Sequence, residues 1–193
     1  MKKALIVLTV CLLQTTDLSA QLQTKILGGI SICNFSKIPF GTTDFKAGLQ
    51  FGGLLMFGSR NYLETGAWYS EKAIDYIIDD GTTSITNEFK FTGIRVPVSV
   101  GFRLLGDKDA QFNLRIFGGG SGFFLLSVSD NLNTSDFVSP SWALHTGAGI
   151  DIWLVTLDVT YEWSMSNIQK DNSVLDFGKF RTIYVTAGFR LTL

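Results

Sequence analysis

Residues 155–165 alternate strictly between apolar and polar side chains, and this pattern constrains the fold more than any other feature of the sequence. The apolar positions are Val155, Leu157, Val159, Tyr161, Trp163 and Met165. A period of two is that of a β-strand, whose successive side chains point to opposite faces. The segment therefore predicts a strand with one apolar face and one polar face.

The same alternation recurs in residues 94–104 and 183–193. In the first of these, Arg95 and Arg103 occupy the polar face. Weaker but compatible runs are found at 24–34, 46–57, 62–70, 111–128 and 142–152. Together these segments predict about eight strands, an even number.

The connections between these segments alternate in length. Short ones fall at 59–61, 106–109 and a tight reversal at 153–155, whereas longer polar ones fall at 36–44, 77–88, 131–139 and 167–179. Outer-membrane barrels have this topology, with short periplasmic turns and longer external loops. A membrane sheet must also close on itself, because unpaired backbone groups in hydrocarbon are costly. The sequence thus predicts an all-β fold, a closed antiparallel up-and-down transmembrane β-barrel of about eight strands.

The first twenty residues have the organisation of a secretory signal. Lys2 and Lys3 form a basic start, residues 4–13 form an apolar stretch, and a short polar approach ends at Ala20. The apolar stretch is too short for a membrane anchor. We expect cleavage after Ala20, which leaves residues 21–193 as one outer-membrane barrel domain, exported to the bacterial outer membrane.

Composition and charge exclude several classes of function. The formal net charge is −1 and 17% of residues are charged, so nothing favours binding of nucleic acid. Cys11 lies within the signal, which leaves Cys33 alone and excludes an internal disulfide. Cys33 and the single histidine, His145, make no cluster of soft metal ligands. We therefore expect neither a metal nor another cofactor.

A secreted soluble barrel that binds a small ligand is the alternative, because it shares the alternation but hides its apolar face. Large aromatic residues near the strand ends favour the membrane barrel, whose two interfaces carry aromatic girdles. The residues expected in these girdles are Trp68, Tyr69, Trp142, Trp153, Tyr161, Trp163 and Tyr184.

The polar faces of the strands collect charged residues that would point into the lumen. The expected network consists of Glu64, Arg95, Arg103, Arg115, His145, Asp151, Asp158, Glu162 and Arg190. The interior of an eight-stranded barrel is only wide enough to be filled by side chains, so these groups are expected to pair into a buried plug. A wide diffusion pore is disfavoured, and the expected role of the network is structural.

A lipid A-modifying barrel enzyme is a further alternative, which would have to use His145. Barrel deacylases carry a Ser-Asn pair directly after their histidine, whereas Thr146 and Gly147 follow His145. A hydrogen-bonded histidine in the lumen is therefore the favoured interpretation, and no catalytic residue is assigned.

Five short stretches carry barrel-type motifs, at 24–29, 94–98, 147–151, 157–162 and 188–190. Together they resemble the PorT-like outer-membrane β-barrel family of Bacteroidetes-type bacteria. The resemblance implies an eight-stranded outer-membrane barrel without a settled activity, although some members take part in export of cargo.

The end of the chain also looks like the signal that the barrel-assembly machinery reads, here Thr186, Gly188, Leu191 and Leu193. The expected partners are thus outer-membrane lipid, this machinery during biogenesis, and an envelope or extracellular protein that contacts the loops.

Overall fold

The computed structural model describes residues 22–35, 42–45, 47–79, 84–128, 138–166 and 179–192. These residues form nine strands: β1 (Leu22–Phe35), β2 (Thr42–Phe45), β3 (Ala47–Phe57), β4 (Asn61–Asp79), β5 (Ser84–Leu105), β6 (Phe112–Val128), β7 (Ser141–Ile152), β8 (Val155–Ser164) and β9 (Phe180–Thr192). No helix among the described residues is long and apolar enough to span a bilayer.

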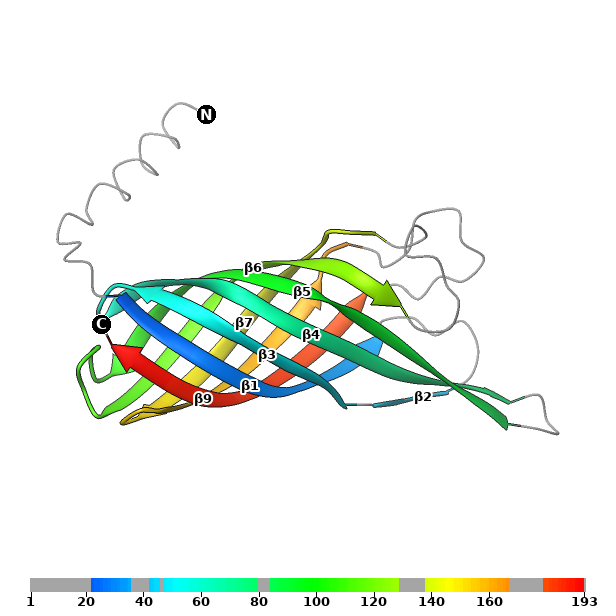
Figure 1. The fold of residues 1–193 in the computed structure, drawn as a ribbon, viewed down its shortest axis with the longest axis horizontal. Helices are drawn as coiled ribbons and strands as arrows, with labels where there is room; N and C mark the ends of the chain where they lie inside the picture. The colour runs from blue at the N-terminus through cyan, green and yellow to red at the C-terminus, as the bar shows by residue number, and fades with distance from the viewer. Residues whose placement is uncertain are drawn as a thin grey trace, which may run out of the picture.

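Eight of the strands close into an antiparallel barrel (Figure 1). Each of them pairs with its neighbours in the order β4-β3-β1-β9-β8-β7-β6-β5, and pairing of β4 with β5 closes the ring. The first and last strands lie side by side, with Gln23 opposite Thr192. The ninth strand, β2, pairs with the outer part of β4, where Thr42 lies opposite Ile77. The predicted closed barrel of about eight strands is therefore confirmed.

One end of the barrel carries the short connections that were expected at 59–61, 106–109 and 153–155. The turn between β3 and β4 and the turn between β5 and β6 each begin with a glycine of positive φ, Gly58 at 117° and Gly106 at 77°. A residue with a β-carbon adopts this backbone region less readily than glycine does. The start of β1 and the end of β9 lie at this same end (Figure 1). We call it the turn end of the barrel.

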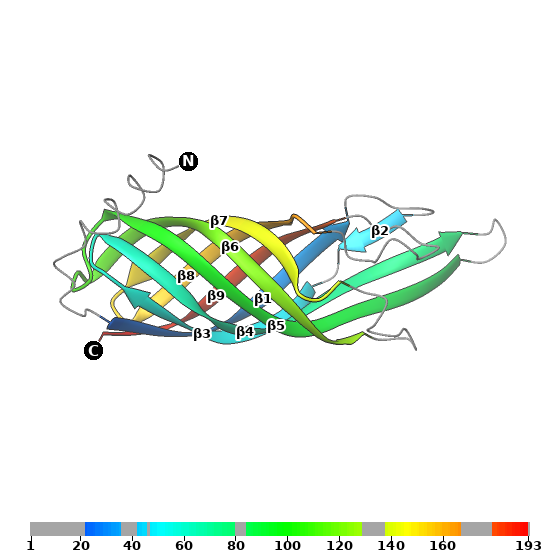
Figure 2. The same cartoon turned by 90° about the horizontal axis from the view of Figure 1, so that it is seen from above.

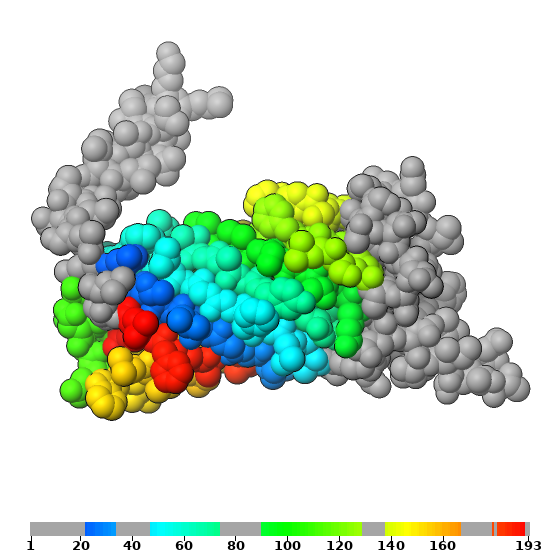
Figure 3. Space-filling view, in the orientation of Figure 1, coloured from blue at the N-terminus to red at the C-terminus, as the bar shows by residue number. Residues whose placement is uncertain are grey.

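The barrel has its apolar side chains outside and its polar ones inside. Among the described residues, 23 buried side chains are polar or charged and 11 are hydrophobic. On β8 the alternation is complete: Leu157 and Val159 are exposed, while Asp158 and Thr160 are buried. Figure 3 shows β1, β3 and β9 packed together in the outer wall. This arrangement confirms the membrane-barrel prediction over the soluble barrel, whose apolar face would be hidden.

Two of the expected long loops are wrong in part, because the strands extend into them. Residues 77–88 were expected to be loop, but β4 continues to Asp79 and β5 starts at Ser84. Residues 42–45, at the end of the expected loop 36–44, form β2. The extensions of β4 and β5 project beyond the barrel as a long hairpin (Figure 2). In β5 the alternation changes phase there. The apolar positions are even-numbered in residues 94–104 but odd-numbered at Ile85, Phe89 and Phe91, so the run predicted at 94–104 is shorter than the strand.

Two of the residues expected in the aromatic girdles are also placed wrongly. Trp68 and Tyr184 are buried in the lumen, with 4% and 1% of their surface exposed. Trp68 lies directly opposite Arg95 in the β4–β5 ladder, and the Tyr184 hydroxyl donates a hydrogen bond to Glu162. Both residues are in register with inward-facing positions, and strand register overrides the preference of an aromatic residue for the interface. By contrast, Tyr69, Trp142, Trp153 and Tyr161 are exposed on the outside.

A charge placed at mid-height of the outer wall should destabilise the barrel more than one placed near the turn end. Val159 and Val155 lie on the outward face of β8 and are 48% and 52% exposed. We expect Val159→Arg to cost roughly 2–4 kcal/mol and Val155→Arg about 0–1 kcal/mol, because the cost of arginine depends on its depth in the bilayer. Urea unfolding of the barrel in lipid vesicles measures both values, and equal costs would contradict a lipid-facing wall.

Candidate functional site

The lumen holds the charged side chains of the barrel, and the structure places all nine of the sequence-predicted residues in it. Each has at most 5% of its surface exposed. Their contacts separate into two clusters along the barrel axis, with a small cavity between them. Seven of the nine residues take part in ion pairs, whereas Arg103 and His145 bond to neutral groups.

The outer cluster is organised around the carboxylate of Glu162 on β8. One carboxylate oxygen accepts hydrogen bonds from Arg95 Nε on β5 and Ser121 Oγ on β6, each at 2.6 Å. The other accepts from Lys72 Nζ on β4 at 3.3 Å and from the Tyr184 hydroxyl on β9 at 2.9 Å. A single buried acid thus connects five strands around the barrel. We call these five residues the Glu162 cluster.

Aromatic rings add to the environment of the two cations in the Glu162 cluster. The Arg95 guanidinium lies 4.6 Å from the centre of the Tyr184 ring, and Lys72 Nζ lies 4.8 Å from the centre of the Phe123 ring. A cation held over an aromatic face is attracted by the quadrupole of the ring, more strongly where water is excluded. These rings therefore compensate part of the desolvation of Lys72 and Arg95.

The inner cluster, toward the turn end, is organised around the guanidinium of Arg115 on β6. Its Nη2 pairs with Asp158 Oδ1, and its Nε donates to Asp151 Oδ1 at 3.2 Å. Glu64 Oε2 lies 3.8 Å from Arg115 Nη1 and 3.4 Å from Lys25 Nζ. Lys25 also lies 3.9 Å from Asp158 Oδ2. These five residues, which we call the Arg115 cluster, join strands β1, β4, β6, β7 and β8.

Two further arginines connect the lumen to the turns. Arg190 Nη2 donates to the backbone carbonyls of Ala110 and Trp153 at 3.1 and 2.9 Å, and its Nη1 lies 3.7 Å from Asp151 Oδ2. Arg103 Nη2 donates to Gln23 Oε1 at 2.5 Å, and its Nη1 donates to the carbonyl of Gly58 at 3.4 Å. The side chains that fill the turn end are therefore bonded to the turns that cover it.

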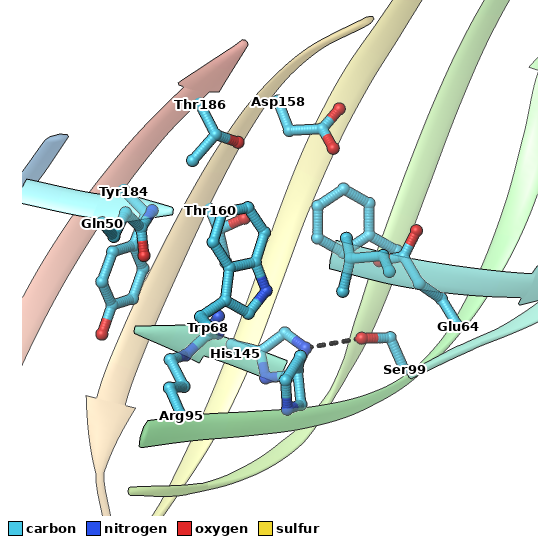
Figure 4. A pocket seen from close by; sticks show the side chains of 13 residues that line it. Gln50, Glu64, Trp68, Arg95, Ser99, His145, Asp158, Thr160, Tyr184 and Thr186 are labelled. Carbon is cyan, nitrogen blue, oxygen red and sulfur yellow. Dashed lines mark hydrogen bonds between the residues drawn. The ribbon is translucent and has the colours of Figure 1, made fainter. Parts of the chain in front are cut away.

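A cavity of about 20 Å³ lies between the clusters (Figure 4). Its walls include Gln50, Trp68, Arg95, Ser99 and His145, together with Glu64 and Asp158 of the Arg115 cluster. His145 Nε2 and Ser99 Oγ are 2.8 Å apart, and this is the hydrogen bond drawn in Figure 4. A volume of this size holds about one water-sized particle, so it accommodates neither an organic substrate nor a lipid.

The described lumen provides neither a catalytic triad nor a metal cluster. His145 bonds to Ser99, but its Nδ1 has no hydrogen-bond partner, whereas a triad needs an acid there to orient the imidazole. Among the described residues, no three His, Cys, Asp or Glu side chains group closely enough to hold a metal ion. Cys33 is a buried free thiol whose Sγ lies 3.1 Å from Thr182 Oγ1.

Several lumen residues were absent from the sequence prediction. Lys25 and Ser121 lie on inward faces of predicted strands, where the alternation alone could have identified them. Lys72 lies beyond the predicted end of its strand at residue 70, so the pattern gave no signal for it. Tyr184 has an aromatic ring typical of a girdle, but its register on β9 points it into the lumen. The strand alternation therefore locates the lumen but not the donors that surround Glu162.

The fold and the lumen together define a class of protein. A closed antiparallel barrel with an apolar exterior and a charged, side-chain-filled interior is a transmembrane β-barrel of the outer-membrane type. The family model for the outer membrane protein beta-barrel domain matches residues 14–170, and the chain belongs to this family. The predicted outer-membrane barrel family is confirmed at this level.

Solved structures that resemble the chain include an outer membrane protein and a bacterial surface protein. OprG from Pseudomonas aeruginosa is 12% identical with a TM-score of 0.53, and the match covers 90% of this chain and 97% of OprG. Neisserial surface protein A is 13% identical over 89% of this chain and 97% of its own, with a TM-score of 0.49. At such identities the likeness to OprG establishes the fold alone. No curated protein matches the sequence.

Removal of the acid at the centre of the Glu162 cluster should be severely destabilising. Glu162→Gln leaves Arg95 and Lys72 buried without their carboxylate, and breaking a buried ion pair in this way costs roughly 3–5 kcal/mol. Urea unfolding in vesicles gives the change in the free energy of unfolding.

The matched control is Glu71→Gln on β4. The Glu71 carboxylate lies 3.7 Å from Lys90 Nζ, but both side chains are partly exposed, so we expect a loss of about 0–1 kcal/mol. Similar losses for the two variants would show that Glu162 does not organise the lumen.

Proposed function

We propose that this protein is a non-enzymatic, non-conducting outer-membrane barrel that presents the β4–β5 hairpin to an envelope or extracellular protein. The observation that carries the proposal is the combination of a filled lumen with two strands that run far past the lipid-facing wall. A filled lumen disfavours transport through the barrel, and the projecting hairpin supplies a surface for contacts.

The length of the hairpin exceeds what a membrane requires. β4 has 19 residues and β5 has 22, whereas a transmembrane strand needs about 9–11. Both strands begin or end next to turn-end connections, at Asn61 and Leu105, so their excess lies at the opposite end (Figure 1). In outer-membrane barrels the short turns face the periplasm, which puts the hairpin outside the cell.

The filled lumen supports a closed barrel. The Glu162 cluster and the Arg115 cluster connect opposite walls, and Arg190 and Gln23 bond to carbonyls of the turn-end loop, including that of Lys108. The cavity between the clusters is of water size. A solute could pass only if buried ion pairs broke, which is costly.

The same geometry disfavours the lipid A-modifying enzyme. The hydrogen bond between Ser99 and His145 has the residue types of a nucleophile and its base, but both side chains are buried in the lumen and no acid orients His145 Nδ1. A lipid substrate would have to reach a water-sized cavity. A hydrogen-bonded structural histidine accounts for these contacts without catalysis.

We also propose how the protein reaches the membrane. Residues 1–20 act as a signal for export and are cleaved. The barrel-assembly machinery then reads the last strand, where Thr186 and Gly188 lie on the inner face and Leu191 on the outer face. Leu193 lies outside the described residues. Within the wider family we assign the chain to the PorT-like group, on its motifs at 94–98 and 147–151.

Cysteine labelling on intact cells tests the orientation on which the proposal depends. Ser139 is exposed at the long-loop end and Asp109 is exposed at the turn end. We expect Ser139→Cys to react with a membrane-impermeant maleimide, and Asp109→Cys to react only after the outer membrane is opened.

The native Cys33 is buried and serves as the background control. Labelling of Asp109→Cys, but not of Ser139→Cys, on intact cells would invert the orientation and overturn an external role for the hairpin.

A further inference from the structure

We infer that the cavity between the two clusters is a binding site for one monoatomic anion of the size of chloride. The site would be enclosed by Trp68, Arg95 and His145, with Gln50 beside them. It concerns the interior of the barrel and is independent of any partner at the hairpin.

Three residues on the cavity wall each carry a buried side-chain nitrogen without a hydrogen-bond partner: Trp68 Nε1, Arg95 Nη2 and His145 Nδ1. Trp68 and Arg95 are directly opposite each other in the β4–β5 ladder, and each of the three side chains is at least 95% buried. Leaving such groups unbonded in a low-dielectric interior is costly. A ligand that accepts hydrogen bonds from all of them would remove this cost.

The first two of these atoms are obligate donors, and His145 can be a third. When the Ser99 hydroxyl donates to His145 Nε2, the imidazole proton resides on Nδ1, which is then a donor. Gln50 Oε1 is also unpartnered and lines the same cavity. A half-turn of its amide presents two further donor hydrogens. The wall therefore suits a species that only accepts hydrogen bonds.

The two acids on the cavity wall do not oppose this assignment, because both are engaged by cations. Glu64 lies within 3.4 Å of Lys25 Nζ, and Asp158 pairs with Arg115. Likewise, Arg95 uses its Nε for Glu162 and retains Nη2 for the cavity.

Size selects the class of anion. The cavity measures about 20 Å³, and one water-sized particle needs about 10–15 Å³ of such space. A halide fits this volume, whereas sulfate, phosphate and carboxylate ligands are too large.

Unfolding at constant ionic strength tests the inference, with chloride compared against gluconate, which is too large for the cavity. For the wild-type barrel in vesicles, we expect the unfolding equilibrium constant to fall tenfold for each tenfold rise in chloride above its dissociation constant. Trp68→Phe removes one donor and should shift this dependence to roughly tenfold higher chloride. Trp142→Phe, on the exposed outer face, is the matched control and should behave as the wild type does.

Bromide replacement gives a second, independent measurement on the wild-type protein, which remains decisive if Trp68→Phe fails to fold. Crystals grown in bromide should show an anomalous scattering peak between Trp68, Arg95 and His145. Equal stability in chloride and gluconate, or a cavity without that peak, would overturn the inference.

Discussion

Every backbone amide and carbonyl that lies in hydrocarbon must find a partner within the protein, and the architecture follows from this constraint. An open sheet would leave two unpaired edges, so β4 pairs with β5 and the first strand pairs with the last. Closure leaves side chains pointing either to lipid or to a narrow lumen. Apolar side chains therefore alternate with polar ones along each strand, and this alternation is most complete on β8.

Closure of the barrel also leaves polar side chains in a narrow lumen, where they must bond to one another. Eight strands enclose too little space for bulk water, yet the inward positions are polar. The acids therefore accept hydrogen bonds from several walls at once: Glu162 from four strands, and the acids around Arg115 from a shared set of cations. Such networks connect strands distant in sequence, because Lys72 and Glu162 are separated by 90 residues. The same side-chain contacts thus hold the wall rigid and close the lumen.

The parts of the fold that could be predicted from sequence are those in which one face must be apolar. Within the bilayer, the strands at 94–104 and 155–165 were recognised almost to their ends. Beyond it no such requirement exists, and the continuation of β4 and β5 through residues 71–79 and 84–93 was not recognised.

The lumen shows the same division. Glu162 and Arg95 were found because charge on an inward face is conspicuous. Tyr184 was not found because its hydroxyl acts in the lumen while its ring resembles an interfacial one. Which lumen side chains bond to each other depends on which strands face each other across the barrel. The periodicity along one strand carries no information about this. The hydrogen bond between Ser99 and His145, which spans 46 residues, is another contact of this kind.

The most direct test of the central claim, a closed barrel with its apolar face toward lipid, is gel migration of the outer-membrane fraction before and after boiling. We expect the detergent-extracted protein in that fraction, and we expect the unboiled sample to migrate faster than the boiled one, because the closed barrel stays compact in detergent. A protein recovered from the soluble periplasm, with the same migration before and after heating, would contradict it.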